Sequence, residues 1–351
     1  MIYFFIKRIS YGIFVLIGVI IVVFLLFHAL PGDPVSLIAG QRSDINDRKA
    51  ITKELGLDKA LHIQFALYIN DLSFISVHQN TVENQHKYEF KEIADIGNRV
   101  LVIKKPYLRR SFQTNKKVTE IIYDNMDDTL WLALSAMLIA SVFGISLGVI
   151  AALNQNTWID HAFISISVLG ISIPSFVSAI VIAMVFGFYL SDYTGLNLTG
   201  QLWVNHPIRG RELQLQNLIL PAITLGIRPL AIIAQLTRSS MLEVLSLDYI
   251  RTAYAKGLSR FKVVMKHALK NGMNPVITAV SGWLASLMAG AFFVEYIFDW
   301  KGLGFTTIKA VQSLDFPVVM GVTLFVATIF VIINIFVDLL YAVIDPRIRL
   351  S

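Results

Sequence analysis

Residues 248–275 read DYIRTAYAKGLSRFKVVMKHALKNGMNP, a basic stretch between two long apolar segments. Ile250, Ala253 and Tyr254 recur at helical spacing and predict a short helix with one apolar face. Gly257 is the residue type expected just past a helix end, where the chain turns left-handed. Ser259 fits the N-cap position of a second helix. The stretch is therefore predicted to hold two short helices that meet at Gly257.

The second helix is predicted to carry two different faces. Its apolar residues recur at i, i+3, i+4 and i+7: Phe261, Val264, Met265 and Ala268. Its lysines recur at steps of four: Lys262, Lys266 and Lys270. This pattern indicates an ordered loop that offers a docking face at a membrane surface. The alternative is a basic loop that faces lipid and only orients its flanking spans, and periodicity alone favours that alternative.

The composition indicates a membrane protein with several spans. Of the 351 residues, 55% are hydrophobic and 15% are charged, and the mean hydropathy is +0.64. A soluble domain carries about 25% charged residues. Cysteine is absent, which excludes disulfides, thiolate metal sites and a cysteine nucleophile. The net charge of +6 could indicate nucleic-acid binding, but in a membrane protein it indicates Lys and Arg retained on the cytoplasmic side.

Six segments are long and apolar enough to cross a bilayer, which takes about 20 residues. They are Ile9–Leu30, Thr129–Leu153, Ala162–Leu190, Leu218–Thr237, Val276–Ile297 and Val318–Val343. The first is too long and too apolar for a cleaved signal peptide, so it is predicted to remain as a span. An even number of spans puts both termini on one side. Basic residues there and in the 248–275 stretch predict that this side is the cytoplasm, whereas the loop Asn154–Asp160 has no basic residue and does not contribute. The basic residues at the two ends are Lys7, Arg8, Arg347 and Arg349.

This topology divides the chain into three regions. Residues 1–30 are predicted to form a peripheral span, residues 31–128 an extracytoplasmic region, and residues 129–351 a five-helix core with a cytoplasmic loop at 239–271. In the second span, small residues repeat at every fourth position: Ala136, Ala140, Gly144, Gly148 and Ala152. The third span has a similar stripe: Ser175, Ala179, Ala183 and Gly187. The fifth span carries Gly282, Ser286 and Gly290. Such stripes let helices approach closely in lipid, so these three spans are predicted to be central.

The extracytoplasmic region is only partly predictable. Leu61, Phe65 and Tyr68 indicate an amphipathic helix near the membrane surface, and Val100–Ile103 indicates a short strand. Residues Ser76–Arg99 are polar and show no clear period, so we make no prediction of their order. A separate enzyme domain is not expected here, because the region has too few apolar residues to build its own core.

Three residues within the predicted spans are candidates for a polar path. Pro174 interrupts the third span and Pro221 lies near the start of the fourth, and each frees a backbone carbonyl and kinks its helix. A broken helix that lines a cavity and a purely structural kink are both consistent with this. Arg228 lies near the middle of the fourth span, where a charge is costly unless it faces water or a partner. The alternative is that Arg228 snorkels or lies near an interface in a tilted span.

Sequence signatures of catalysis are missing. The chain has no Walker-type G-x-x-x-x-G-K-[ST], no H-E-x-x-H and no G-x-S-x-G. Its seven His do not have metal-ligand spacing. We therefore expect no catalytic residue, no metal site and no cofactor.

Several stretches together resemble one family. Arg251-Thr252-Ala253 precedes Gly257 at the distance found in the signature loop of ABC importer membrane subunits, whose pattern is E-A-A, three residues, then Gly. The Glu is missing and Thr replaces the first Ala, which resembles the R-T-A-x-A-K-G form of the dipeptide/oligopeptide/nickel permease branch. Four further stretches resemble motifs of the B-type subunit of that branch: HALPGDPV (His28–Val35), LGLDKALHIQF (Leu55–Phe65), FVEYIFDWKGLG (Phe293–Gly304) and DLLYAVIDPRIR (Asp338–Arg349). Arg228 and the insert around Ser76–Arg109 depart from the family's pattern.

The resemblance implies an all-α membrane protein with the type I ABC importer transmembrane fold, six transmembrane helices and a large extracytoplasmic loop between the first two. It implies a permease subunit of a bacterial inner membrane, with its termini in the cytoplasm, that carries peptides or similar small solutes. Its implied partners are a paralogous C-type permease subunit, two cytoplasmic ABC ATPase subunits and an extracytoplasmic solute-binding protein. ATP hydrolysis would take place on the ATPase subunits.

The resemblance also implies roles for particular residues. The helix from Asp248 to Gly257 would be the coupling helix, which docks on the ATPase. Its contact residues, with the glycine that fixes the turn, would be Tyr249, Arg251, Thr252, Ala253, Lys256 and Gly257. The translocation path would be lined or shaped by Pro174, Ser175 and Arg228. The outer mouth, near the binding protein, would contain Glu295, Trp300, Gly302 and Gly304.

Two other classes of function compete with this interpretation. A secondary transporter that works alone would call for internal repeats and several paired intramembrane charges, whereas the sequence places one Arg within its spans. A membrane-anchored sensor or scaffold would use the outer insert as its working part. Neighbouring genes for a second six-span subunit and for P-loop ATPases would favour the importer. The sequence alone does not separate dipeptides, oligopeptides, nickel, glycosides or antimicrobial peptides as cargo.

Overall fold

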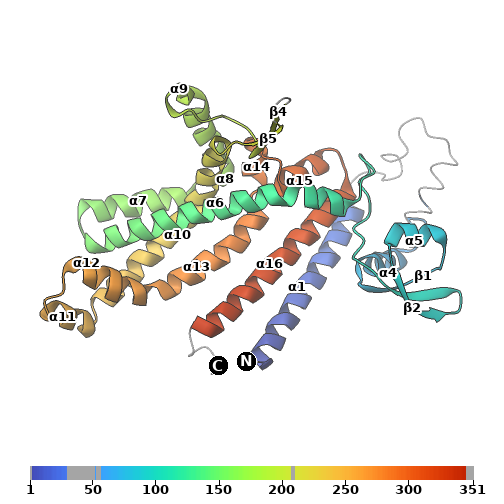
Figure 1. Cartoon of the computed structure of the whole chain (residues 1–351), viewed down its shortest axis with the longest axis horizontal. Coiled ribbons are helices and arrows are strands. Elements are labelled where there is room, and N and C mark those ends of the chain that lie inside the picture. The colour runs from blue at the N-terminus through green and yellow to red at the C-terminus, as the bar shows by residue number, and fades with distance from the viewer. Residues whose placement is uncertain (1, 30–51, 53–56, 207–209, 345–351) are drawn as a thin grey trace. The chain divides into compact units, whose positions relative to one another are not determined.

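The computed structural model describes residues 2–29, 52, 57–206 and 210–344, most of which are helical (Figure 1). The chain divides into two compact units, which are described separately below. Unit 1 consists of Met1–Val15, Asn125–Ile308 and Val326–Ser351, and unit 2 consists of Leu16–Asp124 and Lys309–Phe325. Arg347, Arg349 and residues 30–35 of the HALPGDPV motif lie outside the described residues, as do residues 55–56 of the LGLDKALHIQF motif.

Four helices in the described part of the chain are long and apolar enough to cross a membrane. They are α1 (Ile2–Ala29), α6 (Val118–Leu153), α10 (Gln216–Leu245) and α16 (Phe316–Ile344). Only 17% of the apolar window in α1 is buried, compared with 61% in α10. Of these four helices, α1 is the least covered and α10 the most covered by the rest of the described chain.

The predicted third span is broken near its middle. Helix α7 (Trp158–Ser172) is followed by α8 (Ser175–Ile182) and the π-helix η1 (Ala183–Tyr189), and the two arms are bent by 107°. Pro174 causes the break, because a residue that precedes proline is pushed out of the α region. Ile173 is accordingly extended, with φ −76° and ψ 128°. The expected kink at Pro174 is confirmed, and the bend is sharp enough to redirect the chain.

The predicted fifth segment is divided between two helices. Helix α13 (Leu269–Gly290) holds most of it, and the short helix α14 (Phe292–Ile297) holds the rest. After α14, the chain continues into α15 (Leu303–Gln312). Helix α13 is not among the helices that are apolar enough to cross a membrane, because it begins with polar residues. The described residues therefore contain four or five candidate spans by composition, depending on whether the bent pair counts as one.

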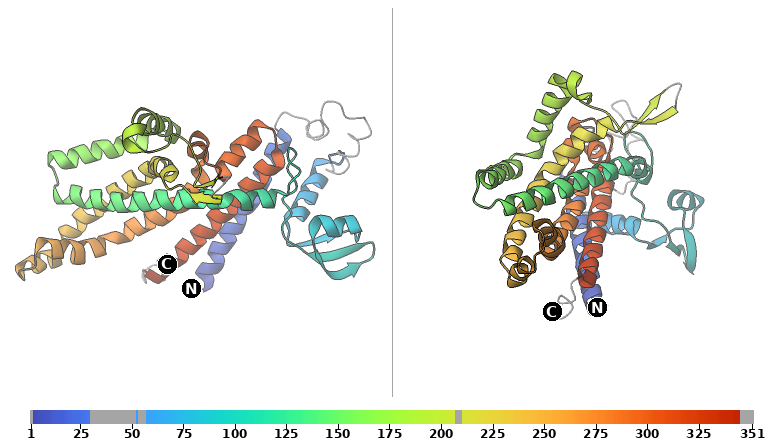
Figure 2. Two further views of the ribbon diagram at one scale, coloured as in Figure 1. Left: turned by 45° about the horizontal axis from the view of Figure 1, so that its top comes forward. Right: turned by 60° about the vertical axis from the view of Figure 1, so that its left-hand side comes forward.

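Helix α10 forms the centre of unit 1. It packs against α7 and α13 (Figures 1 and 2) and lies backbone to backbone against α6. A Cβ atom built on Gly148 would come within 2.5 Å of the Ala234 carbonyl oxygen, and one built on Gly226 within 2.9 Å of the Ala136 carbonyl oxygen. Ala136 and Ala140 are fully buried. The small-residue stripe predicted for the second span is therefore the surface that meets α10.

Unit 2 contains the predicted helix and strand, and the polar insert within it also forms regular secondary structure. Helix α4 (Leu61–Leu72) precedes β1 (Ile75–His78), α5 (Val82–Tyr88), β2 (Lys91–Ile96) and β3 (Arg99–Ile103). The three strands form an antiparallel sheet in the order β1-β3-β2. Val100 and Val102 are buried on one face of β3. The insert thus forms a helix and a sheet with one partly buried face, which the polar sequence does not reveal.

Candidate functional site

The first predicted helix of the 248–275 stretch is α11 (Asp248–Ala255). Ile250 is 1% exposed and Ala253 is 6% exposed, as the apolar spacing predicts, but Tyr254 is 42% exposed. The buried face of α11 is therefore narrower than predicted. Gly257 has a φ of +78°, and its N–H donates to the Tyr254 carbonyl at 2.9 Å. The predicted left-handed turn at Gly257 is confirmed.

The second predicted helix begins as α12 (Arg260–Lys262) and continues through the π-helix η2 (Val263–Ala268) into α13. The Ser259 hydroxyl accepts from the Lys262 N–H at 3.5 Å, so the predicted cap is present.

The predicted apolar face of this helix is wrong in part. Phe261 is 75% exposed and Met265 is 47% exposed, whereas Val263, Val264 and Ala268 are buried. A π-helix has wider turns than an α-helix, with i→i+5 hydrogen bonds. As a result, Val263 joins Val264 and Ala268 on the buried side, whereas Phe261 and Met265 do not.

The loop is a packed part of unit 1. Buried residues from the ends of α6 and α10, from α11 and from η2 form one apolar cluster: Ala152, Met241, Val244, Ile250, Ala253, Val263, Val264 and Ala268. The Tyr249 hydroxyl donates to the His267 carbonyl at 3.2 Å and accepts from the Asn271 side chain at 2.8 Å. Arg260 donates to the Leu153 carbonyl at 3.1 Å. A lipid-facing loop that only orients its flanking spans does not need this buried cluster or these hydrogen bonds.

The residues expected on the docking face of α11 differ in their exposure. Arg251, Thr252 and Lys256 are exposed. Arg251 pairs with Asp248 in its own helix at 3.4 Å, and the Thr252 hydroxyl donates to the Asp248 carbonyl at 3.0 Å. Ala253 is buried, so it holds the helix in place and is not part of the surface.

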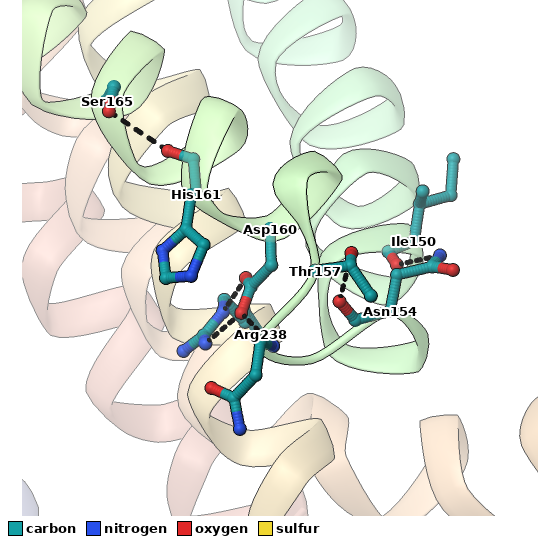
Figure 3. A network of polar contacts seen from close by, with 8 residues as sticks. Ile150, Asn154, Thr157, Asp160, His161, Ser165 and Arg238 are labelled. Carbon is teal, nitrogen blue, oxygen red and sulfur yellow. Dashed lines mark hydrogen bonds and ion pairs between the residues drawn. The ribbon is translucent and has the colours of Figure 1, made fainter.

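An ion pair that the sequence reasoning missed lies close to this loop (Figure 3). Arg238 on α10 holds the Asp160 carboxylate of α7 with two hydrogen bonds, from Nε to Oδ1 at 2.5 Å and from Nη2 to Oδ2 at 2.6 Å. The Asn156 N–H donates to the same carboxylate at 3.0 Å. The Asp160 side chain is 1% exposed and that of Arg238 is 21% exposed. The pair thus fixes the start of α7 to the last turns of α10, which leads into α11.

A cavity of about 110 Å³ lies among α8, α10, α13 and the end of α7. Ser175 and Arg228 both line it, so the structure brings together these two residues of the predicted path. Pro174 is the N-cap residue of α8. It therefore sets the direction of the helix that carries Ser175.

The four residues expected at the outer mouth are buried. Glu295 and Trp300 are both 0% exposed. The Glu295 carboxylate accepts from the Thr129 hydroxyl at 2.7 Å and from the Phe305 N–H at 3.0 Å, and the Trp300 indole donates to the Asp128 carbonyl at 2.9 Å. These side chains hold the α14–α15 connection to the start of the second span.

Gly302 and Gly304 belong to the same packed connection. A Cβ atom on Gly302 would come within 2.5 Å of the Glu295 carboxylate, and one on Gly304 within 2.6 Å of the Phe292 Cα atom. Both positions therefore need glycine. Because all four residues are buried, this geometry supports a structural role for them and not direct contact with a partner.

These observations define a class: a helical membrane protein with several apolar helices, a broken helix beside a cavity and a packed basic loop. Among the described residues, no three His, Asp or Glu side chains gather where they could hold a metal ion.

The comparisons give the family. The chain belongs to the binding-protein-dependent transport system inner membrane components: the model of that family matches residues 144–350, and the model of its N-terminal region matches residues 1–133.

Several relatives match almost end to end. The chain is 36% identical over 357 residues to the dipeptide transport system permease protein DppB of Alkalihalophilus pseudofirmus, covering 98% of each chain. It is 36% identical over 367 residues to DppB of Escherichia coli strain K12, covering 99% of each. It is 35% identical over 343 residues to the glutathione transport system permease protein GsiC of Salmonella typhi, covering 98% of this chain and 97% of the relative. The predicted resemblance is confirmed: the chain is a multi-pass permease subunit of an ABC importer and a transport component rather than an enzyme.

Proposed function

We propose that the chain forms, with a paralogous C-type permease subunit, the translocation path for di- or oligopeptides or similar small solutes. Relatives of the chain are named as dipeptide and glutathione permeases, which supports peptides as the cargo class. An extracytoplasmic solute-binding protein delivers the cargo, and two cytoplasmic ATPase subunits drive transport. ATP hydrolysis takes place on the ATPase subunits.

The observation that carries this proposal is the construction of the loop at 239–271. Helix α11 presents Tyr249, Arg251, Thr252 and Lys256 while its other side, with Ile250, packs into the apolar cluster. Gly257 sets the turn behind it. Because the same cluster includes the ends of α6 and α10, a force on α11 is passed to those helices. A rigidly attached helix can therefore convert closure of the ATPase subunits into rotation of the spans, as alternating access requires.

The cavity lined by Ser175 and Arg228 is the proposed segment of the path, with Pro174 shaping it. Its position next to a broken helix supports this, because irregular backbone at membrane depth occurs where it lines a cavity. At the outer mouth, we assign to Glu295 and Trp300 the role of fixing the surface that a binding protein meets, since both are buried.

The proposed topology has six crossings with both termini in the cytoplasm of a bacterial inner membrane. The crossings are α1, α6, the bent pair α7–η1, α10, α13 with α14, and α16. In this arrangement, residues 1–30 are the peripheral span, residues 31–128 the large extracytoplasmic loop, and residues 129–351 the permease core.

Reconstitution tests the proposal against its alternatives. The complex of both permease subunits and both ATPase subunits, in proteoliposomes with the binding protein, is expected to take up radiolabelled dialanine only when ATP and Mg²⁺ are present on the ATPase side. A secondary transporter would show uptake by this chain alone, driven by an ion gradient and insensitive to vanadate. A scaffold or sensor would show no uptake in either format. Either of these two results would contradict the proposal.

A further inference from the structure

The cavity beside the bent helix pair has the chemistry of an oxyanion site. Its lining includes one charged side chain, that of Arg228, together with the hydroxyls of Ser175, Ser178 and Ser286. These residues come from α8, α10 and α13, so the fold and not one local motif assembles them.

Arg228 has no partner within the described part of the chain: no hydrogen bond or ion pair joins it to another residue there. The contrast with Arg238, almost three turns further along α10, is direct, because Arg238 is neutralised by Asp160. Arg228 is exposed, and a guanidinium at mid-span is costly unless it faces water or a partner. An anion that enters the cavity would supply such a partner.

The serine hydroxyls of the cavity are also uncommitted. Serine and threonine in apolar helices commonly donate to the carbonyl one turn earlier, and Thr224, which lines the same cavity, does so to Leu220 at 2.8 Å. Within the described residues, no such bond engages Ser175, Ser178 or Ser286. Three hydroxyl donors therefore remain available among the residues that line the cavity with Arg228.

We propose that Arg228, with Ser175, Ser178 and Ser286, binds a carboxylate of the cargo during its passage. The guanidinium fork matches a carboxylate in a bidentate arrangement, and hydroxyl donors satisfy the remaining lone pairs. The cavity of about 110 Å³ has room for an end group and not for a whole peptide. This inference rests on the proposed function, because it names the chemical group that the path recognises.

Uptake by charge-changed variants tests the transport side of the inference. In the reconstituted complex, Arg228→Gln is expected to slow dialanine uptake about tenfold, since a charge-assisted bidentate pair is lost. Uptake of the C-terminal amide of dialanine is expected to change less than twofold. Each variant is compared with the wild-type complex on the same cargo and binding protein, so the selectivity of the binding protein cancels. Alanyl-glutamate amide separates the two possible sources of the carboxylate, the C-terminus and an acidic side chain. If Arg228→Gln slows its uptake as much as that of dialanine, the site also binds the carboxylate of an acidic side chain.

Ser178→Ala tests a serine of the proposed site, and Thr224→Val is its matched control. Ser178→Ala is expected to slow dialanine uptake about threefold, because it removes a free donor. Thr224→Val is expected to leave the ratio of the two cargoes unchanged, because its hydroxyl is already bound to its own helix. Arg228→Lys keeps the charge but not the fork and is expected to lie between wild type and Arg228→Gln. Equal slowing of both cargoes by Arg228→Gln, or no slowing of either, would overturn the inference.

A binding measurement tests the proposed carboxylate site independently of transport. Trp283 lines the cavity, so its fluorescence in the purified complex reports occupancy, with Trp283→Phe as the blank. N-acetylalanine is expected to change this fluorescence saturably in wild type and not in Arg228→Gln, and N-acetylalanine amide is expected to have no effect in either. Absence of a response to N-acetylalanine in wild type would refute the site even if uptake is normal. A saturable response without ATP-driven uptake would support the site and refute the proposed function.

Discussion

Gly257→Pro is expected to abolish ATP-driven uptake while leaving membrane insertion and subunit assembly intact. Proline holds φ near −65°, whereas Gly257 has a φ of +78°, so the native turn cannot form. The change also removes the N–H that donates to the Tyr254 carbonyl at 2.9 Å. With the turn lost, α11 leaves the apolar cluster that joins it to α6 and α10. ATP hydrolysis should continue but become independent of cargo. The measurement is ATPase activity and uptake in the same proteoliposomes, with and without binding protein.

Gly97→Pro is the matched control for this experiment. Gly97 also has a positive φ, +65°, and no atom lies within 4 Å of a Cβ built on it. It belongs to the connection between β2 and β3 in unit 2 and not to the loop. The same backbone conflict at Gly97 is expected to leave coupling unchanged. Normal uptake by the Gly257→Pro complex would show that α11 is not the element that transmits ATPase closure.

Asp160→Ala is expected to lower the free energy of unfolding by about 3 kcal/mol, because it leaves a largely buried guanidinium without its partner. The two short bonds to Arg238 and the bond from the Asn156 N–H are all lost. The start of α7 should then separate from α10, so uptake should fall more steeply than ATP hydrolysis. Thermal unfolding of the purified complex and the ratio of uptake to hydrolysis are the two readouts.

Two further variants separate the charge from the geometry. Arg251→Ala removes an exposed pair, Arg251 with Asp248, whose side chains are 77% and 94% exposed, and is expected to change stability by less than about 0.5 kcal/mol. The double variant Asp160→Leu with Arg238→Met replaces the pair by apolar groups and should recover much of the stability that Asp160→Ala loses. Equal stability of Asp160→Ala and wild type would show that the pair does not fasten α7 to α10.

Features set by neighbouring residues could be predicted from the sequence. The turn at Gly257, the cap at Ser259, the break at Pro174 and the strand over Val100–Ile103 depend on local rules of backbone conformation. The stripe of small residues in α6 was predictable because packing in lipid uses such stripes. Family membership followed from motifs in register along the chain, and the comparisons confirm it.

Features set by distant residues could not be predicted in this way. Asp160 and Arg238 meet only after α7 folds against α10. The residues around each of them in the sequence form no pattern that predicts this ion pair. The burial of Glu295 depends on Thr129, on another helix. Phe261 and Met265 were assigned to the wrong face because a local π-helix is not visible in a pattern of apolar residues.

The most direct test of the central claim is the accessibility of Lys256, which is exposed in this chain. The protein has no cysteine, so Lys256→Cys introduces a single thiol. A membrane-impermeant maleimide is expected to label this variant in inside-out vesicles and not in intact cells, and at least tenfold more slowly when the ATPase subunits are bound. Tyr193→Cys, at a position 88% exposed on the short helix α9 (Ser191–Thr194), is the control that should label in intact cells. Labelling of Lys256→Cys in intact cells, or at the same rate with and without the ATPase subunits, would contradict the account.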